Sequence, residues 1–364
     1  MIFQSLRTVS FRNLVDAETL AAGKDVFLVG ENGQGKTNFL EALYFAAYGS
    51  SFRGARDGEL AREGEKGYAV QATLAPAGSP RGGEAPAAYS RELRVKYEKG
   101  KKAVLLDGKQ VADRRELLSV VPCIVFCHED MEFVSGSPER RRWFFDQTLS
   151  LCDGLYLDDL RNYRRVLKAR NAVLRDCVAS QHAAGVLDAL DPQLAAYGIK
   201  LMGQREKAVR LFSSLFEPLY RGISGIGGVE VRYAPSWRLL GQILGGPSPA
   251  FADAGAGDAT SAAIAHLAGR READIAAGLS LSGPHRDRYV FCRGGEEFAG
   301  KASTGQRRLL ALLLRVAQAR RFSETTGKNP VLLLDDVLLE MDGEKRERFL
   351  SAMPAYDQAF YTFL

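Results

Sequence analysis

The sequence predicts an α/β domain that is interrupted by a helical insertion. A short apolar run, a glycine-rich loop and a helical pattern follow one another within residues 24–49, the order of a strand, a loop and a helix. Helical periodicity replaces the strand-like runs further along the chain, and a second apolar strand ending in two aspartates comes only near its end. We therefore expect one domain in two parts, residues 1–137 and 281–364, around a helical insertion at 138–280.

The composition is that of a globular chain with a sizeable core. The chain has 364 residues, of which 46% are apolar, and a net charge of +5. It has no apolar run long enough to span a membrane, and its N-terminus lacks the pattern of a secretory signal, so we expect a cytoplasmic protein. Five scattered cysteines suit a reducing compartment. Cys123 and Cys127 lie beside His128, but a second pair of metal ligands is missing, which favours a buried strand over a metal site.

The glycine-rich loop GENGQGKT has the spacing GxxxxGK[ST] of a phosphate-binding P-loop. Inward-facing N–H groups in such a loop form an anion nest, and the helix that follows adds a partial positive charge. We expect Lys36 to contact the β- and γ-phosphates of ATP, and Thr37 to bind Mg²⁺. The predicted ATP contacts in and after the loop are Gly30, Glu31, Asn32, Gly33, Gln34, Gly35, Lys36, Thr37 and Asn38.

The late apolar strand, Val331–Leu334, has the form of a Walker B strand. Asp335 would hold Mg²⁺ together with Thr37, and Asp336 would orient or deprotonate the attacking water. The predicted catalytic residues are therefore Lys36, Asp335 and Asp336. ATPases of this architecture mostly carry Glu at the second acidic position. The shorter Asp336 predicts slow hydrolysis.

A second phosphate-binding device precedes the Walker B strand by about 25 residues. Ser303, Thr304, Gly305 and Gln306 stand directly before a long helical pattern, where a hydroxyl and a helix N-terminus can bind phosphate. One P-loop already surrounds one triphosphate. The second device therefore implies a nucleotide held by another subunit, as in ABC-type ATPases, and we expect an ATP-dependent homodimer.

The insertion contains apolar residues at spacings of three, four and seven, which predict two long amphipathic helices joined near residues 180–191 and packed antiparallel. A Gly/Ala/Pro-rich stretch near 245–263 predicts a disordered linker. Residues 161–175 hold six basic residues and no acidic one, which suits a phosphate backbone but is also common on a solvated helix face. The DNA-binding candidates are Arg161, Arg164, Arg165, Lys168 and Arg170, with Lys200, Arg205, Lys207 and Arg210 on the returning helix.

Motifs spread over nearly the whole chain resemble the RecF family of bacterial recombination mediators, which is related to the Rad50 and SMC heads. SSFR, SPERRR and GPHRD separate this family from Rad50 and SMC proteins. The matching segments are FRN (11–13), GENGQGKTNFLEAL (30–43), SSFR (50–53), HEDMEFVSGSPERRRWFFD (128–146), GPHRDRYVF (283–291), ASTGQRRLLAL (302–312) and LLLDDVLLEMD (332–342).

The resemblance implies an α/β, ABC-type (Rad50/SMC-like) P-loop ATPase head interrupted by a helical arm domain. It implies ATP and Mg²⁺ as cofactors and an ATP-driven dimer that binds DNA at gaps and single-strand/double-strand junctions. It further implies cooperation with RecO and RecR in loading the RecA recombinase, in support of replication restart and SOS induction, with weak DNA-stimulated ATP hydrolysis.

Several site residues are implied only by their position in these motifs. Arg12 and Asn13 would lie near the nucleotide, Glu129 and Asp130 in a Q-loop-like segment, and Asp342 in the D-loop. This chain departs from the family pattern in carrying His128 in place of Pro and Leu339 in place of Ser, and no switch histidine follows the last predicted strand, AFYTFL.

Three other classes of P-loop protein remain as alternatives. A Rad50- or SMC-like head that acts with a nuclease or in chromosome organisation needs long heptad arms, whereas the insertion has room only for a helical hairpin. A transporter ATPase subunit would carry an LSGGQ-like signature, a switch histidine and membrane partners. A metabolic P-loop kinase would lack the signature and end with a lid.

Overall fold

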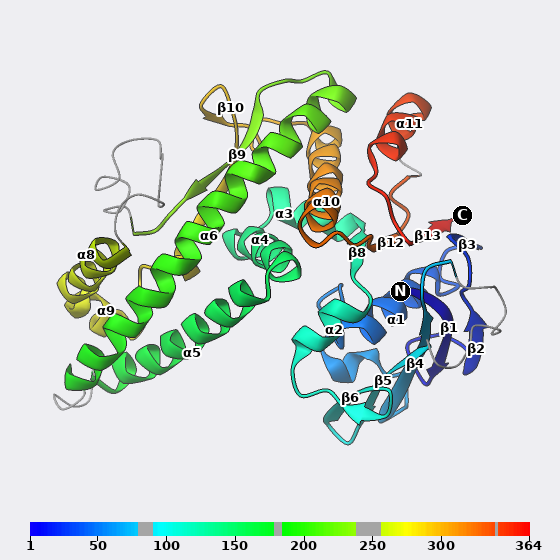
Figure 1. Ribbon diagram of the computed structural model, residues 1–364, viewed down its shortest axis with the longest axis horizontal. Coiled ribbons are helices and arrows are strands. Elements are labelled where there is room, and N and C mark those ends of the chain that lie inside the picture. Colours follow the sequence, from blue (N-terminus) through cyan, green and yellow to red (C-terminus); the bar gives the residue numbers. More distant parts are fainter. Residues whose placement is uncertain (79–89, 178–183, 238–255, 339–340) are drawn as a thin grey trace. The chain divides into compact units, whose positions relative to one another are not determined.

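The computed structural model describes residues 1–78, 90–177, 184–237, 256–338 and 341–364 (Figure 1). The chain divides into two compact units, one made of residues 1–130 and 311–364 and the other of residues 131–310. This division falls at 130 and 311, not at the expected 137 and 281, so the Ser303–Gln306 segment belongs to the second unit.

A parallel four-stranded sheet carries the nucleotide motifs of the first unit. Its order is β3-β13-β12-β8, and all three pairs are parallel. The two strands β12 and β8 are buried along their whole length, as expected for runs of apolar residues in a parallel sheet. The carboxyl ends of parallel strands share one edge, so the segments that follow these strands meet there. The bounds are β3 (Asp25–Val29), β8 (Cys123–Phe126), β12 (Val331–Leu334) and β13 (Gln358–Phe363).

An antiparallel six-stranded sheet completes this unit, in the order β2-β1-β4-β5-β6-β7. Helix α1 (Lys36–Tyr48) follows the P-loop and contacts β4, β5 and β13, which accounts for its burial from Leu40 to Tyr48. The remaining elements are β1 (Ile2–Val9), β2 (Ala17–Leu20), η1 (Asp57–Leu60), β4 (Gly67–Ala75), β5 (Arg91–Glu98), β6 (Lys101–Leu106), β7 (Lys109–Gln110), α2 (Arg114–Val120), η3 (His128–Met131) and α11 (Gly343–Ala352).

The second unit is built around the two predicted long helices, α5 (Gly154–Cys177) and α6 (Ala184–Ser224), which pack along one another (Figure 1). Apolar side chains of both helices form a core with Trp237 and α8. A three-stranded antiparallel sheet, β11-β10-β9, completes the unit. The other elements are α3 (Glu132–Ser135), α4 (Pro138–Cys152), β9 (Val229–Ala234), α8 (Ala256–Gly269), α9 (Arg271–Ala277), η5 (Pro284–Arg286), β10 (Arg288–Arg293), β11 (Glu296–Glu297) and the start of α10 (Thr304–Thr326).

Part of the segment expected to be a disordered linker is helical. Residues 256–263 form the first half of α8, so the prediction is wrong for them, while residues 245–255 lie outside the described part of the chain. Ala259, Ala263 and Leu267 recur every four residues and are buried in the core of the second unit. Alanine is also the strongest helix former, so the many alanines of this segment favour a helix, although its Gly- and Ala-rich composition resembles that of a linker. No helix among the described residues is long and apolar enough to cross a membrane.

Candidate functional site

The P-loop closes tightly between β3 and α1. Gly33 and Gly35 have φ angles of 83° and 94°, in the left-handed region that favours glycine. A Cβ atom at Gly35 would also lie 2.9 Å from the Oδ1 atom of Asn13. The Lys36 ammonium folds over the loop, where it donates to the carbonyl of Glu31 at 2.9 Å and to that of Gly30. Its charge thus lies within the loop that is expected to bind phosphate.

Asn13 and Asn38 brace the P-loop from its side. Asn13 donates from Nδ2 to the Gly33 carbonyl at 2.8 Å, and Asn38 donates to Asn13 Oδ1 at 2.7 Å. Arg12 behaves differently, because its guanidinium donates to both carboxylate oxygens of Glu41, at 3.0 and 3.1 Å. Glu41 is fully buried on α1, so Arg12 neutralises a core carboxylate while the backbone carries Asn13 to the loop.

The two ends of the chain meet at the predicted magnesium ligands. Thr37 donates from Oγ1 to Asp335 Oδ1 at 2.9 Å, although the two residues are 298 positions apart. Burial raises the pKa of Asp335 above its ordinary value, against the bond from Thr37, which lowers it. A hydroxyl and a carboxylate are hard oxygen ligands of the kind that Mg²⁺ prefers, and a bound cation would keep Asp335 ionised. The pair therefore fits a Mg²⁺ ion.

Thr362 on β13 joins this site and was missed by sequence reasoning. The backbone N–H of Asp336 donates to Thr362 Oγ1 at 2.7 Å, and the same oxygen lies 3.0 Å from Asp336 Oδ1 and 3.2 Å from Asp335 Oδ1. Asp336 has a φ of 53°, which is uncommon for a residue with a side chain. Thr362 thus holds the backbone of Asp336 and can donate its one hydroxyl proton to either aspartate. The available signal was its place near the carboxyl end of a strand parallel to β12.

The two residues of the Q-loop-like segment have separate surroundings. Glu129 is half exposed and lies 3.9 Å from Arg53, which in turn donates to Asn38 at 3.2 Å. Asp130 is buried and accepts from Arg315 at 2.7 and 3.0 Å. Burial raises the pKa of Asp130, and the Arg315 guanidinium opposes that rise. Glu129 is therefore linked to the P-loop, whereas Asp130 anchors α10.

The two cysteines beside this segment are both buried. Cys123 lies in β8 and Cys127 directly after it, which confirms the predicted buried strand. Burial raises the pKa of both thiols. They pack as small apolar side chains.

The signature segment caps helix α10 and faces solvent. The backbone N–H of Ser303 donates to Gln306 Oε1 at 2.8 Å, and that of Gln306 donates to Ser303 Oγ at 3.3 Å, a reciprocal capping box. Thr304 and Gly305 are exposed beside Ser303. Asp342 caps α11 in the same way by accepting from the N–H of Lys345, while Leu339 lies outside the described residues.

The basic run on α5 separates into exposed and buried arginines. Arg164, Arg165 and Lys168 are exposed, and Arg161 is partly exposed, 3.9 Å from Asp158. Arg170 is 0% exposed and lies 2.7 Å from Asp191 and 2.8 Å from Asp274. The prediction that Arg170 contacts DNA is therefore wrong. A guanidinium with two buried carboxylate partners cannot leave them without a large free-energy cost.

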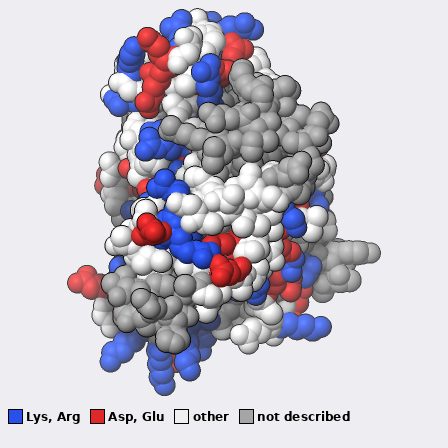
Figure 2. Space-filling model, turned by 90° about the vertical axis from the view of Figure 1, so that its left-hand side faces the viewer, with Lys and Arg blue, Asp and Glu red and all other residues white. Residues whose placement is uncertain are grey.

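The same correction applies to Arg205 on α6. Its side chain is buried and lies 2.8 Å from Asp146 and 2.9 Å from Asp287. Lys200, Lys207 and Arg210 stay exposed on that helix. On the face shown in Figure 2, clusters of Lys and Arg side chains lie among clusters of Asp and Glu side chains.

Comparison with known proteins agrees with this geometry. Residues 2–362 match the family of RecF/RecN/SMC N-terminal domains. A DNA replication and repair protein RecF of Treponema pallidum is 41% identical over 364 residues, which cover 99% of this chain and 93% of that protein. A second one, from Synechococcus, is 32% identical over 367 residues, covering 100% of this chain and 91% of that protein.

A solved structure described as the recombination mediator protein RecF with ATP in the RecFOR pathway superposes with a TM-score of 0.86. Its identity is 25%, with 99% of this chain and 91% of that chain covered. The predicted α/β, Rad50/SMC-like ATPase head with a helical insertion is thereby confirmed. The chain belongs to the RecF family.

Proposed function

We propose that the chain is an ATP-switched DNA clamp of recombinational repair. The observation that carries the proposal is the meeting of Thr37 and Asp335 at 2.9 Å beside a closed P-loop. A magnesium–triphosphate site needs these two ligands at one place, and the chain supplies them from opposite ends of its sequence. The identity of 41% with a RecF protein supports repair as the setting.

In this proposal ATP binds on the backbone N–H groups of residues 30–38, and Lys36 turns from the loop carbonyls to the β- and γ-phosphates. Thr37 and Asp335 hold Mg²⁺ directly or through water. Asp336, fixed by Thr362, orients the attacking water. Its short side chain makes hydrolysis slow, so that the bound triphosphate lasts long enough to act as a switch.

The exposed signature Ser303–Gln306 closes over the γ-phosphate held by a second copy of the chain, and Asp342 lies at the same dimer contact. One P-loop and one signature per chain make two shared sites in a homodimer. Hydrolysis then weakens the dimer, which gives a weak, DNA-stimulated ATPase whose purpose is to set how long the clamp stays closed.

The exposed basic residues of the helical unit bind DNA phosphates without reading sequence. Arg161, Arg164, Arg165 and Lys168 are the contacts on α5 that remain after Arg170 is excluded. By family membership we propose binding at gaps and single-strand/double-strand junctions, and cooperation with RecO and RecR in RecA loading in the cytoplasm. Replacing Lys168 by Gln is expected to lower the slope of log affinity against log salt by about 0.9 on duplex DNA.

Sedimentation with and without ATP tests the clamp. Wild type should dimerise only with ATP and Mg²⁺, whereas Ser303→Arg should bind ATP and remain a monomer. Thr325→Arg is the matched control, because Thr325 is exposed on the same helix away from the signature. Failure of the wild type to dimerise with ATP would refute the proposal.

A further inference from the structure

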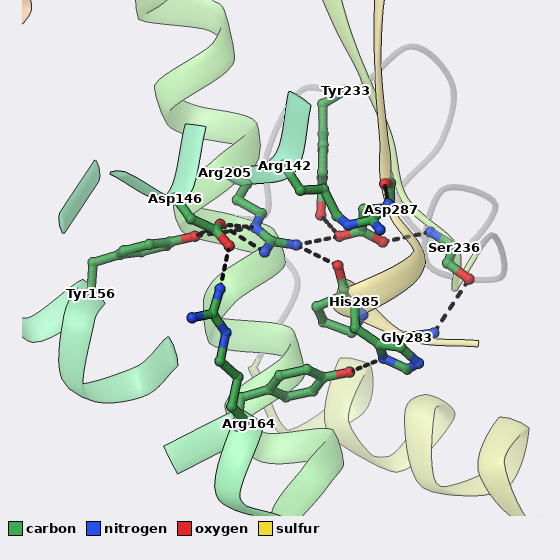
Figure 3. Close-up of polar contacts among 12 residues, drawn as sticks. Arg142, Asp146, Tyr156, Arg164, Arg205, Tyr233, Ser236, Gly283, His285 and Asp287 are labelled. Carbon is green, nitrogen blue, oxygen red and sulfur yellow. Dashed lines mark hydrogen bonds and ion pairs between the residues drawn. The ribbon is translucent and has the colours of Figure 1, made fainter. Parts of the chain in front are cut away.

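A cavity of about 320 Å³ opens in the second unit, where α4, α5, α6 and η5 come together. Part of its lining comes from the SPERRRW and GPHRD motifs, to which the ATP and signature sites assign no role, and the rest comes mainly from α5 and α6. Its volume lies at the lower end of small-ligand pockets and is enough for one nucleotide unit. Figure 3 shows the polar contacts that surround it.

The floor of the cavity is a rigid, charge-balanced network around Arg205. The guanidinium donates to Asp146 from Nη2 at 2.8 Å and to Asp287 from Nη1 at 2.9 Å, and Nη1 also donates to the Pro284 carbonyl at 2.7 Å (Figure 3). Tyr156 and Tyr233 bind the same two carboxylates. The positive charge of Arg205 is neutralised by these carboxylates. The floor therefore contributes a fixed shape to the cavity and no cation that is available to a ligand.

One wall is neutral near physiological pH. His285 lies 3.0 Å from Nε2 to the Ser280 carbonyl, which can only accept, so Nε2 carries the proton. Its Nδ1 atom therefore accepts from the Tyr163 hydroxyl at 2.7 Å. Burial lowers the pKa of His285 to about 4. Tyr163 and His285 accordingly present a fixed, uncharged aromatic surface.

The rim supplies positive charge that remains accessible. The Arg164 side chain is 61% exposed and lies 3.3 Å from Asp146, a contact that uses one of its five N–H donors. Arg140 is exposed on the first turn of α4. The charged residues that line the cavity are Arg140, Arg142, Arg164, Arg205, Glu139 and Asp146. Arg205 is paired with Asp146 and Asp287, and Arg142 pairs with Glu139 at 2.9 Å, so the accessible positive charge at the mouth comes from Arg140 and Arg164. An anionic group is therefore favoured at the mouth.

Trp143 adds an aromatic platform to this charged rim. Its side chain is 38% exposed and lines the cavity, and its ring stacks on the buried Phe133 with centroids 5.7 Å apart. A large exposed aromatic ring beside arginines is the arrangement on which unpaired bases stack while their phosphates are bound. An isolated anion site would need no such ring.

We propose that this cavity binds one unpaired nucleotide of a DNA single strand, with its base against Trp143 and its phosphate at Arg140 and Arg164. The inference rests on DNA being the partner, as in the proposed function, and deepens it by assigning the single strand to a defined cavity. Double-stranded DNA cannot use the cavity, because its bases are already stacked and paired.

The two tryptophans of the chain make a direct test possible. Trp237 is 1% exposed in the core of the second unit, so its fluorescence is an internal reference for that of Trp143. Titration with pentathymidylate should quench part of the emission in a saturable way. Trp143→Phe should abolish that quenching, because only Trp237 then emits.

The affinity for a dye-labelled pentathymidylate, measured by fluorescence anisotropy, separates the contribution of base stacking on Trp143 from that of phosphate binding by Arg164. Trp143→Leu should weaken binding by about 5- to 150-fold, the range of one lost base–aromatic stack, and Trp143→Phe by much less. Arg164→Gln should weaken binding and lower the salt slope by about 0.7. Arg221→Gln is the matched control, since Arg221 is 64% exposed and has one carboxylate neighbour, Glu217, at 3.9 Å.

The outcomes distinguish this inference from the clamp. If wild type dimerises with ATP and binds duplex DNA, but pentathymidylate leaves Trp143 emission unchanged, the cavity assignment is overturned and the clamp stands. If pentathymidylate quenches Trp143 while ATP gives no dimer, the cavity stands and the clamp fails. Quenching by a hexaglutamate peptide and not by pentathymidylate would overturn the assignment in favour of an acidic protein segment.

Discussion

In the P-loop, Lys36 donates to main-chain carbonyls of its own loop, whereas on α5 the guanidinium of Arg170 is enclosed by carboxylates from distant parts of the chain. Both are cations in a segment that sequence assigns to phosphate binding. Lys36 can take its proposed role because its partners are neutral backbone carbonyls of its own loop, which a phosphate can replace. Arg170 loses its role because residues 191 and 274 bury it. A cation is thus available for function only where its partners are weak or can be exchanged.

The largest expected effect falls on the buried side of this comparison. Arg170→Ala removes the guanidinium that pairs with the buried Asp274 and leaves Asp191 with Arg271 at 2.8 Å, which should lower the free energy of unfolding by about 3–5 kcal/mol in urea denaturation. Arg165→Ala, on the exposed face of the same helix, should change it by less than about 0.5 kcal/mol. Equal losses in the two variants would remove the distinction between buried and exposed arginines.

The next effect concerns the predicted magnesium site in the first unit. Asp335→Asn keeps an oxygen that accepts from Thr37 but removes the charge expected to hold Mg²⁺. Phosphate release from ATP should slow roughly a hundredfold or more, as is typical when one electrostatic group is lost at a reacting centre. The stability should change little. Glu324→Gln removes an exposed charge elsewhere and should leave the rate unchanged.

A pH dependence follows from the neutral wall of the cavity. The unfolded chain protonates His285 below pH about 6.5, whereas the native protein holds its pKa at about 4, so the unfolded state binds more protons between these values. The free energy of unfolding should therefore fall as the pH drops from about 6.5 to 4, by up to about 3 kcal/mol from this residue. The difference between wild-type and His285→Gln unfolding curves isolates it from nearby carboxylates. A difference that stays constant with pH would show that His285 titrates normally.

The smallest expected effect concerns Thr362, which lies beside the predicted magnesium ligand Asp335. Thr362→Val removes the hydroxyl that accepts from the Asp336 N–H, which should cost about 1–2 kcal/mol of stability. Asp336 should also lose its orientation, so ATP hydrolysis should slow several-fold with little change in ATP affinity. Thr325→Val serves as the control, because its hydroxyl binds only a carbonyl on an exposed helix face. A loss of ATP affinity equal to the loss of rate would place Thr362 in binding instead.

Sequence reasoning located the local structure correctly where a motif consists of consecutive residues. The P-loop, the Walker B strand and the Ser303–Gln306 cap are each defined by a local backbone conformation, which their residue types specify. Thr362 was missed because it reaches Asp336 only through the register of β12 against β13. Arg205 was misassigned because its partner Asp287 is 82 residues away, and nothing local indicates that it is buried.

The contact between Asn13 and the P-loop limits how segments can be exchanged between members of the family. Asn13 donates to the Gly33 carbonyl, and a Cβ atom at Gly35 would lie 2.9 Å from the Asn13 Oδ1 atom, so a side chain at position 35 would displace Asn13. Neither segment can change alone, so the two should be exchanged together when chimeras are made between family members. A graft that carries the loop without Asn13 and the turn around it would lack the side chain that holds the Gly33 carbonyl.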